Sequence, residues 1–212
     1  MSTTQTVSPQ TSPQLAPARR TYRWRVVDII VMAVLAVLTG AIFAGWNIGG
    51  VAWMTVMESL TPGLGGLALG GWLIGGVLGG LIIGKPGAAL LVELLAAFTE
   101  VIFGAQWGWG AVTAGLAQGL AAELIFLATG YRKFTLPVAF IAGGAAGFAN
   151  WVLGLITSGN LAKGLEYNVI FVSSAILSGV VIAGLVGWLF SRGLASTGAL
   201  RQFPLGRLQK RV

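Results

Sequence analysis

Long apolar runs, each nearly free of charge, most constrain the fold of this 212-residue chain. A helix that crosses the hydrocarbon core of a bilayer needs about 20 apolar residues, and its backbone polar groups must be paired within the segment. Six runs have roughly this length: Val26–Gly45, Leu64–Ile83, Gly87–Phe103, Gly110–Thr129, Leu136–Ile156 and Asn168–Phe190. The sequence therefore predicts an all-α, polytopic membrane protein with six transmembrane helices.

The basic residues predict how these helices are oriented. Only 9% of the residues are charged, whereas soluble domains carry about 25%. In a six-helix topology, all but Lys163 of the 13 Lys and Arg residues fall on one side of the membrane. Those residues are Arg19, Arg20, Arg23, Arg25, Lys85, Arg132, Lys133, Arg192, Arg201, Arg207, Lys210 and Arg211. Because cytoplasmic connections are enriched in Lys and Arg, both termini are expected in the cytoplasm. The net charge of +7 therefore indicates contact with anionic lipid headgroups rather than binding to nucleic acid.

Three regions follow from this arrangement. Residues 1–21 are rich in Ser, Thr, Gln and Pro and are expected to form a disordered cytoplasmic tail. Residues 22–192 form the membrane domain, and residues 193–212 form a basic cytoplasmic tail. The connection Trp46–Pro62 is too polar to span and is expected to form a short interfacial helix or a lid.

The composition also excludes several kinds of chemistry. The chain has no Cys and no His, so the usual ligands of zinc, iron–sulfur and haem sites are missing and no metal site is expected. The run Gly79–Lys85 (GGLIIGK) matches the start of a phosphate-binding loop, but Pro86 occupies the position that requires Ser or Thr. The chain is therefore expected to hold no cofactor and to have no enzymatic activity, and any ATP that drives it must bind to another subunit.

Four of the six acidic residues fall inside the expected spans, and Asp28 lies at the inner boundary, one turn from Arg25, where a local ion pair accounts for it, which leaves Glu93, Glu100 and Glu123. Ionisable groups in a membrane are costly and usually functional. From the helical rise, Glu93 and Glu123 each lie about 10 Å from the cytoplasmic boundary. They are predicted to have a structural or coupling role, either beside each other or near Lys85 and Arg132. Glu100 lies near the outer end of its helix.

Other polar and aromatic residues gather at the outer level of Glu100. They are Trp46, Asn47, Gln106, Trp107, Gln118, Asn150, Trp151, Tyr167 and Asn168. An interfacial aromatic belt would account for the tryptophans alone. A carboxylate, amides and aromatic rings together fit a flat, nitrogen-bearing and cationic solute. The sequence therefore predicts one outward-facing binding pocket built from these residues and Glu100.

A stripe of small residues follows the first span at four-residue spacing: Ala36, Gly40 and Ala44. Small residues allow helices to approach closely in lipid. The stripe is consistent with internal packing or with a docking face for another membrane subunit.

Three segments resemble the YkoE family, the substrate-binding S components of energy-coupling factor (ECF) transporters for thiamine or its hydroxymethylpyrimidine precursor. They are WRVVDIIVMAVLAVLTGAIF (Trp24–Phe43), GGWLIGGVLGGLIIGKPGAALLVELLAA (Gly70–Ala97) and QWGWG…AGLAQGLAAELIF (Gln106–Phe126). The resemblance implies a multi-pass subunit of the bacterial plasma membrane that captures a vitamin. It also implies a transmembrane coupling subunit and two cytoplasmic ATPases as partners, and it would assign the stripe of the first span to docking.

Two other functions remain open on the residues alone. A proton-coupled secondary carrier for a small cationic solute would use Glu93 and Glu123, although no internal repeat typical of carriers is evident. An intramembrane enzyme acting on lipid would use the buried carboxylates for acid–base chemistry.

Overall fold

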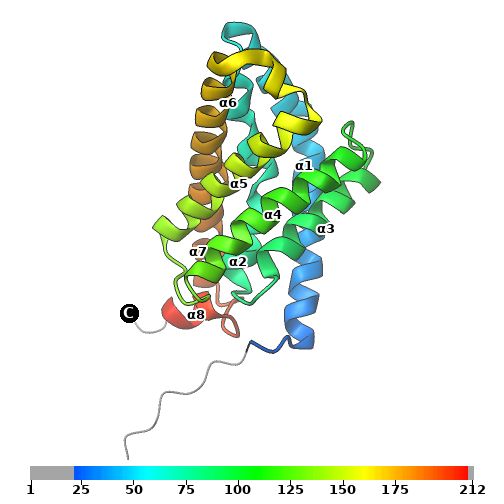
Figure 1. The fold of residues 1–212 in the computed structure, drawn as a ribbon. Coiled ribbons are helices and arrows are strands. Elements are labelled where there is room, and N and C mark those ends of the chain that lie inside the picture. The colour runs from blue at the N-terminus through cyan, green and yellow to red at the C-terminus, as the bar shows by residue number, and fades with distance from the viewer. Residues whose placement is uncertain (1–21, 210–212) are drawn as a thin grey trace, which may run out of the picture.

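The computed structural model describes residues 22–209, and this part of the chain is entirely helical (Figure 1). The all-α prediction is confirmed for these residues. The expected tail 1–21, with Arg19 and Arg20, lies outside the described residues, as do Lys210 and Arg211. The helical elements are α1 (Val26–Leu60), η1 (Leu64–Trp72), α2 (Ile74–Ile82), α3 (Ala88–Ile102), α4 (Trp109–Ala128), α5 (Leu136–Thr157), η2 (Asn160–Lys163), α6 (Gly164–Ser178), η3 (Gly179–Val186), α7 (Gly187–Ser196) and α8 (Pro204–Gln209).

Five helical stretches of the described residues are long and apolar enough to span a membrane: Val26–Leu60, Leu64–Ile82, Trp109–Ala128, Leu136–Thr157 and Asn160–Ser196. The expected third span is the 15-residue helix α3, whose length of about 22 Å is less than the hydrocarbon thickness. Six spans and the orientation of the termini therefore stay predictions.

Helix α1 is longer than expected and corrects the interpretation of Trp46–Pro62 as a separate segment. It runs without interruption for 35 residues to Leu60. Two polar residues beyond Trp46, Asn47 and Glu58, form hydrogen bonds with other segments of the protein, which offsets the cost of placing them in a long helix. Glu58 Oε2, for example, accepts hydrogen bonds from the backbone N–H groups of Gly63 (3.1 Å) and Gly65 (2.9 Å), where the chain turns into η1.

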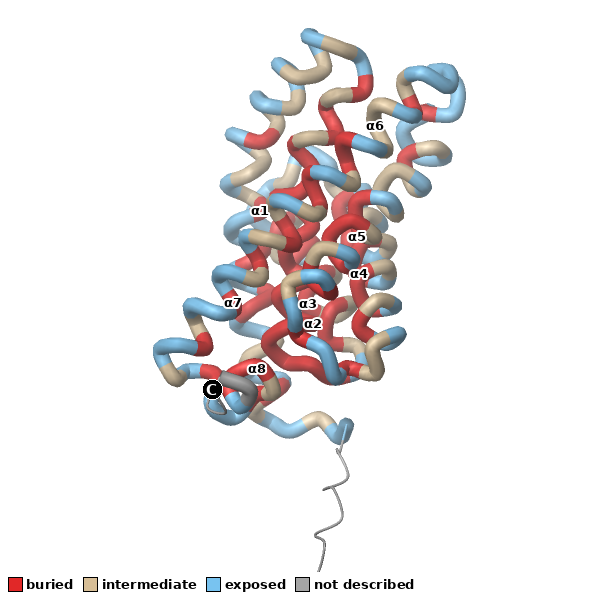
Figure 2. Tube along the Cα trace, turned by 90° about the vertical axis from the view of Figure 1, so that its left-hand side faces the viewer, coloured by how far each residue is buried: buried red, intermediate tan, exposed pale blue. Residues whose placement is uncertain are grey.

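The segment formed by η1 and α2 is the central element of the bundle, and 94% of its most apolar 18-residue stretch is buried. Figure 2 shows buried residues concentrated along α2 and α3, while α1 exposes its outward turns. Glycine makes this close packing sterically feasible. A Cβ at Gly71 would overlap the Trp46 indole, and one at Gly80 would overlap the Phe126 ring.

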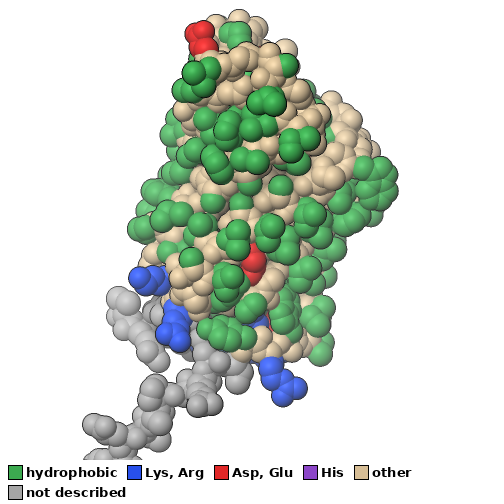
Figure 3. All heavy atoms as spheres, viewed as in Figure 1, with side chains coloured by type: hydrophobic (Ala, Val, Ile, Leu, Met, Phe, Trp, Pro, Cys, Tyr) green, Lys and Arg blue, Asp and Glu red, His purple; other side chains and the backbone are tan. Residues whose placement is uncertain are grey.

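The outer surface is apolar, as expected of a protein surrounded by lipid. Exposed hydrophobic side chains follow α1, α4 and α5, including Val34, Leu120 and Ile141. Figure 3 shows hydrophobic side chains over the face in view, with Lys and Arg confined to its lower end, where α8 lies in Figure 1. We call this end of the molecule the basic end.

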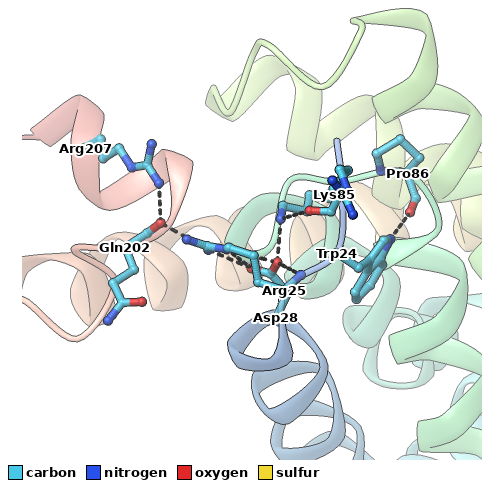
Figure 4. Close-up of polar contacts among 8 residues, drawn as sticks. Trp24, Arg25, Asp28, Lys85, Pro86, Gln202 and Arg207 are labelled. Carbon is cyan, nitrogen blue, oxygen red and sulfur yellow. Dashed lines mark hydrogen bonds and ion pairs between the residues drawn. The ribbon is translucent and has the colours of Figure 1, made fainter. Parts of the chain in front are cut away.

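At the basic end, one buried carboxylate joins the start of α1 to the connection between α2 and α3 (Figure 4). Asp28 is fully buried and forms ion pairs with Arg25 (2.7 Å) and Lys85. Lys85 also donates to the backbone carbonyl of Arg23 (2.6 Å), and Trp24 Nε1 donates to that of Pro86 (3.1 Å). The connection between α2 and α3 is thereby fixed to the residues that precede α1.

The segment after residue 192, expected as a tail, is partly folded. Helix α7 continues to Ser196, and the chain then turns back so that α8 packs under α2 and α7. Leu200, Phe203 and Leu205 are buried there. Arg25 donates to the carbonyl of Gln202 (3.4 Å), which connects this segment to the Asp28 cluster.

Candidate functional site

A cavity of about 500 Å³ lies in the half of the molecule away from the basic end, a volume within the usual range of small-molecule sites. It is enclosed by α1, η1, α3, α4, α5, η2 and α6. Its lining residues are Phe43, Met54, Leu69, Trp72, Glu93, Ala97, Glu100, Trp107, Gly110, Ala111, Thr113, Ala114, Gln118, Asn150, Leu153, Gly154, Thr157, Ser158, Asn160, Lys163, Tyr167 and Phe171. Five residues expected to bind substrate are among them: Glu100, Trp107, Gln118, Asn150 and Tyr167.

Glu100 is 2% exposed and is held against α1. Its Oε1 accepts a hydrogen bond from Asn47 Nδ2 (2.8 Å). Asn47 Oδ1 in turn accepts from the indole N–H groups of Trp72 (3.1 Å) and Trp107 (3.2 Å). The two indoles pack edge to face, with ring centroids 6.4 Å apart. This arrangement places a carboxylate beside two aromatic rings on one wall of the cavity.

A second polar group is formed by Glu93, Gln118 and Asn150, on three different helices. Glu93 is 1% exposed, and its Oε2 accepts from the backbone N–H of Gly76 (2.5 Å). The orientation of the Gln118 amide that satisfies its surroundings directs Nε2 to Glu93 Oε1 (3.1 Å) and the other end to the Asn150 amide (2.7 Å). Glu93, expected to be structural or coupling, is therefore also a cavity-lining residue.

The remaining residues expected to bind substrate lie outside the lining. Trp46 Nε1 donates to the carbonyl of Ala68 (2.9 Å), which ties α1 to η1. Trp151 Nε1 donates to Asn168 Oδ1 (3.0 Å) and joins α5 to α6. Gln106 is exposed in the connection between α3 and α4. Among these residues, Asn47 lies closest to the site because it contacts Glu100 directly.

Glu123 stabilises the start of α3. Its carboxylate accepts from the backbone N–H groups of Gly87 (2.6 Å), Ala89 (2.9 Å) and Leu90 (3.3 Å). These are first-turn N–H groups that lack a partner within the helix, and a negative charge there also complements the helix dipole. The Tyr131 hydroxyl donates to the same carboxylate, and burial together with this contact raises the pKa of Tyr131. Neither Lys85, which pairs with Asp28, nor Glu93 is the partner of Glu123.

The stripe of small residues on α1 faces the interior. Ala36 is 2% exposed. Gly40 is also buried, and a Cβ there would lie 2.5 Å from Thr99 Cβ and 2.7 Å from the Ala96 carbonyl oxygen. Ala44 is half-buried. The burial of Ala36 and Gly40, with Gly40 against α3, favours internal packing for these two residues, and the docking role that the resemblance implies for the stripe stays a prediction.

Sequence reasoning missed several lining residues. Trp72 lies in a glycine-rich run that indicates helix packing, and Asn160 and Lys163 lie in a connection outside the expected spans. A signal for the latter pair existed in the charge distribution, because Lys163 is the one basic residue predicted on the outer side.

Comparison with known proteins identifies the family. A family model described as "ABC-type cobalt transport system, permease component" matches residues 27–149. YkoE of Bacillus subtilis (strain 168), named as an HMP/thiamine permease protein, is 33% identical over 190 residues, which cover 89% of this chain and 93% of that protein. A crystal structure described as an S-component of an ECF transporter matches with a TM-score of 0.75 at 32% identity, covering 89% of this chain and 94% of the other. The chain therefore belongs to the YkoE family and is a multi-pass, substrate-binding S component of an ECF transporter in the cell membrane, and not an enzyme.

Proposed function

We propose that this S component captures thiamine or its hydroxymethylpyrimidine precursor from the outer side of the membrane, in the cavity described above. The observation that carries the proposal is the joint placement of Glu100, Trp72 and Trp107 on one wall. A carboxylate accepts charge-assisted hydrogen bonds from the amino group of an aminopyrimidine and from a protonated ring nitrogen. The indole faces favour a flat ring and a positive charge.

The amides extend this chemistry. Gln118 and Asn150 carry both donors and acceptors, so they can discriminate between hydrogen-bonding patterns on the edge of a ring. Glu93 adds a second carboxylate to the lining, which favours a cationic ligand over an anionic one. The name of the YkoE relative, an HMP/thiamine permease protein, agrees with a ligand of this kind.

The transport step requires partners. The chain has no nucleotide-binding motif of its own, since Pro86 replaces the required Ser or Thr. We place ATP hydrolysis in two cytoplasmic ATPases that act through a transmembrane coupling subunit.

The proton-coupled carrier loses support at Glu123, one of its two candidate residues. Glu123 is engaged by three backbone N–H groups and the Tyr131 hydroxyl. A carboxylate that holds the start of a helix is poorly suited to exchange protons during each transport cycle. Uptake by this chain alone in liposomes, driven by a pH gradient without ATP, would establish the carrier function instead.

Calorimetric titration of the purified chain tests the proposal. Thiamine or hydroxymethylpyrimidine is expected to bind at a stoichiometry near one, while riboflavin is expected not to bind. Glu100→Gln should weaken binding more than about tenfold, which corresponds to a loss of about 1.4 kcal/mol. Glu166→Gln removes an exposed carboxylate from the first turn of α6 and serves as the matched control. Wild-type affinity in Glu100→Gln would remove Glu100 from the site, and failure of both ligands to bind would refute the proposal.

A further inference from the structure

Asn160 carries a buried amide oxygen without a hydrogen-bonding partner. It begins η2, lines the cavity and is only 3% exposed. Its Oδ1 is fully buried and accepts no hydrogen bond, and it is the one such orphaned side-chain atom among the described residues that line the cavity. Buried amides are normally paired, so an unpaired one in a native protein requires an explanation.

The surroundings of Asn160 fix its position. Asn168 Nδ2 donates to the backbone carbonyl of Asn160 (2.7 Å), and Asn168 is itself held by Trp151. The Asn160 amide rests on Gly154, where a Cβ would lie 2.9 Å from Nδ2. Gly154 also lines the cavity. Asn168 on α6 therefore holds the backbone of Asn160, and Gly154 on α5 packs against its amide nitrogen, while the amide oxygen is left unpaired beside the cavity.

Lys163, at the other end of η2, makes this part of the cavity positive. Its Nζ donates to the Tyr167 hydroxyl (3.2 Å) and lies 4.4 Å from the centre of the Tyr167 ring. It is the only Lys or Arg among the described lining residues. The carboxylates of Glu93 and Glu100 belong to α3, which packs against α1, α2 and α4 but not against α5, η2 or α6. The cavity thus has a negative wall on α3 and a positive wall on η2.

This distribution of charge limits which chemical group of a ligand can face η2. An amino group would be repelled by Lys163 and attracted to the carboxylates of α3. A phosphate would require more positive charge than a single ammonium group supplies. A hydroxyl group accepts a hydrogen bond from Lys163 or from the amide nitrogen of Asn160, and it donates one to the amide oxygen once the side chain turns toward it.

We infer that Asn160 and Lys163 form a second polar subsite, which binds a hydroxyl group of the ligand on the wall opposite α3. The inference rests on the proposed function and adds the orientation of the ligand between the two walls of the cavity. In thiamine, the amino-bearing pyrimidine ring faces α3, and the hydroxyl group, which the other ring carries, faces η2. Asn168 and Trp151 act as positioning residues because they hold the turn that carries Asn160.

The experiment compares two ligands that differ by one oxygen atom. The purified full chain is titrated with thiamine and with its analogue that carries an ethyl group in place of hydroxyethyl. We expect the wild type to prefer the hydroxyl compound by about tenfold or more, because the ethyl compound leaves the subsite unpaired. Asn160→Leu, which preserves the side-chain size, should bring this ratio near one, and Lys163→Met should reduce it by about threefold. Lys133→Met removes an exposed cation far from the cavity and should leave the ratio unchanged.

The ratio separates the inference from the proposed function. A general loss of affinity weakens the binding of both ligands by the same factor and leaves the ratio of their affinities unchanged. Structural damage alone therefore does not mimic the expected result. If Asn160→Leu fails to fold, the ratio measured for Lys163→Met tests the inference, because Lys163 is exposed and its substitution is expected to leave folding intact. If hydroxymethylpyrimidine binds and thiamine does not, the inference alone is overturned, because the amino and hydroxymethyl groups of that compound occupy adjacent ring carbons and cannot reach opposite walls. Binding without a hydroxyl preference, or a preference that survives both substitutions, overturns the inference alone. Absence of binding by all these compounds overturns the proposed function as well.

Discussion

Asn47 donates a 2.8 Å hydrogen bond to Glu100, which joins α1 to α3 at the wall of the cavity. The same amide accepts from Trp72 and Trp107 through its oxygen. One side chain therefore orients the carboxylate and both indoles. Asn47 does so from outside the cavity, because it is not one of the lining residues.

Substitution of Asn47 should reduce ligand affinity. Asn47→Leu removes the donor to Glu100 and leaves two indole N–H groups without their acceptor. We expect ligand binding to weaken by about tenfold, equivalent to about 1.4 kcal/mol, as measured by calorimetry. Gln106→Leu, a change in the exposed connection between α3 and α4, should leave affinity unchanged. Equal affinities for the two variants would show that Glu100 keeps its position without Asn47.

Substitution of Glu123 should reduce stability more than binding. Glu123→Gln removes the charge and one acceptor oxygen from the start of α3, so first-turn N–H groups lose a partner. We expect a loss of about 1–3 kcal/mol, measured as a lower melting temperature in detergent. Tyr131→Phe deletes one donor to the same carboxylate and should have a smaller effect, about 1 kcal/mol. If Glu123→Gln melted like the wild type but failed in transport, a coupling role would be favoured over the structural one.

Asp28→Asn should be more damaging. The substitution leaves Lys85, whose side chain is 11% exposed, without its anionic partner in a largely buried position. Breaking one side of a buried ion pair costs about 3–5 kcal/mol. Thermal melting should show this loss, whereas Glu166→Gln, at an exposed carboxylate, should change stability little. A melting temperature close to wild type for Asp28→Asn would mean that the connection between α2 and α3 is held by other contacts.

Two glycines of α1 should respond differently to the same change. Gly40→Ala places a methyl group against Thr99 and the Ala96 carbonyl, and overpacking of this kind costs about 1–3 kcal/mol. Gly45→Ala meets no atom within 4 Å and should be tolerated. The measurement is the melting temperature of the isolated subunit. Equal tolerance of both changes would contradict the internal packing of the stripe and favour its use in docking.

The site was partly predictable from the sequence. Glu100, Gln118 and Asn150 stand out because polar side chains in apolar helices are rare and costly. The roles of Glu93 and Glu123 could not be separated in this way, since both lie at a similar depth in apolar helices. Only the packing shows that Glu123 faces the start of α3 while Glu93 faces the cavity.

The sequence alone determined the helical class, the membrane environment and the concentration of positive charge at one end. Hydropathy and charge are local properties, and a bilayer imposes the same requirement on every segment that crosses it. The tertiary structure decided how each helix is rotated and which partner it meets. Lipid surrounds all apolar faces equally well, so close packing selects the contact surfaces, and packing depends on residues far apart in the chain. Only the folded chain therefore shows that Gly40 faces α3 and that the amide oxygen of Asn160 is buried without a partner beside the cavity.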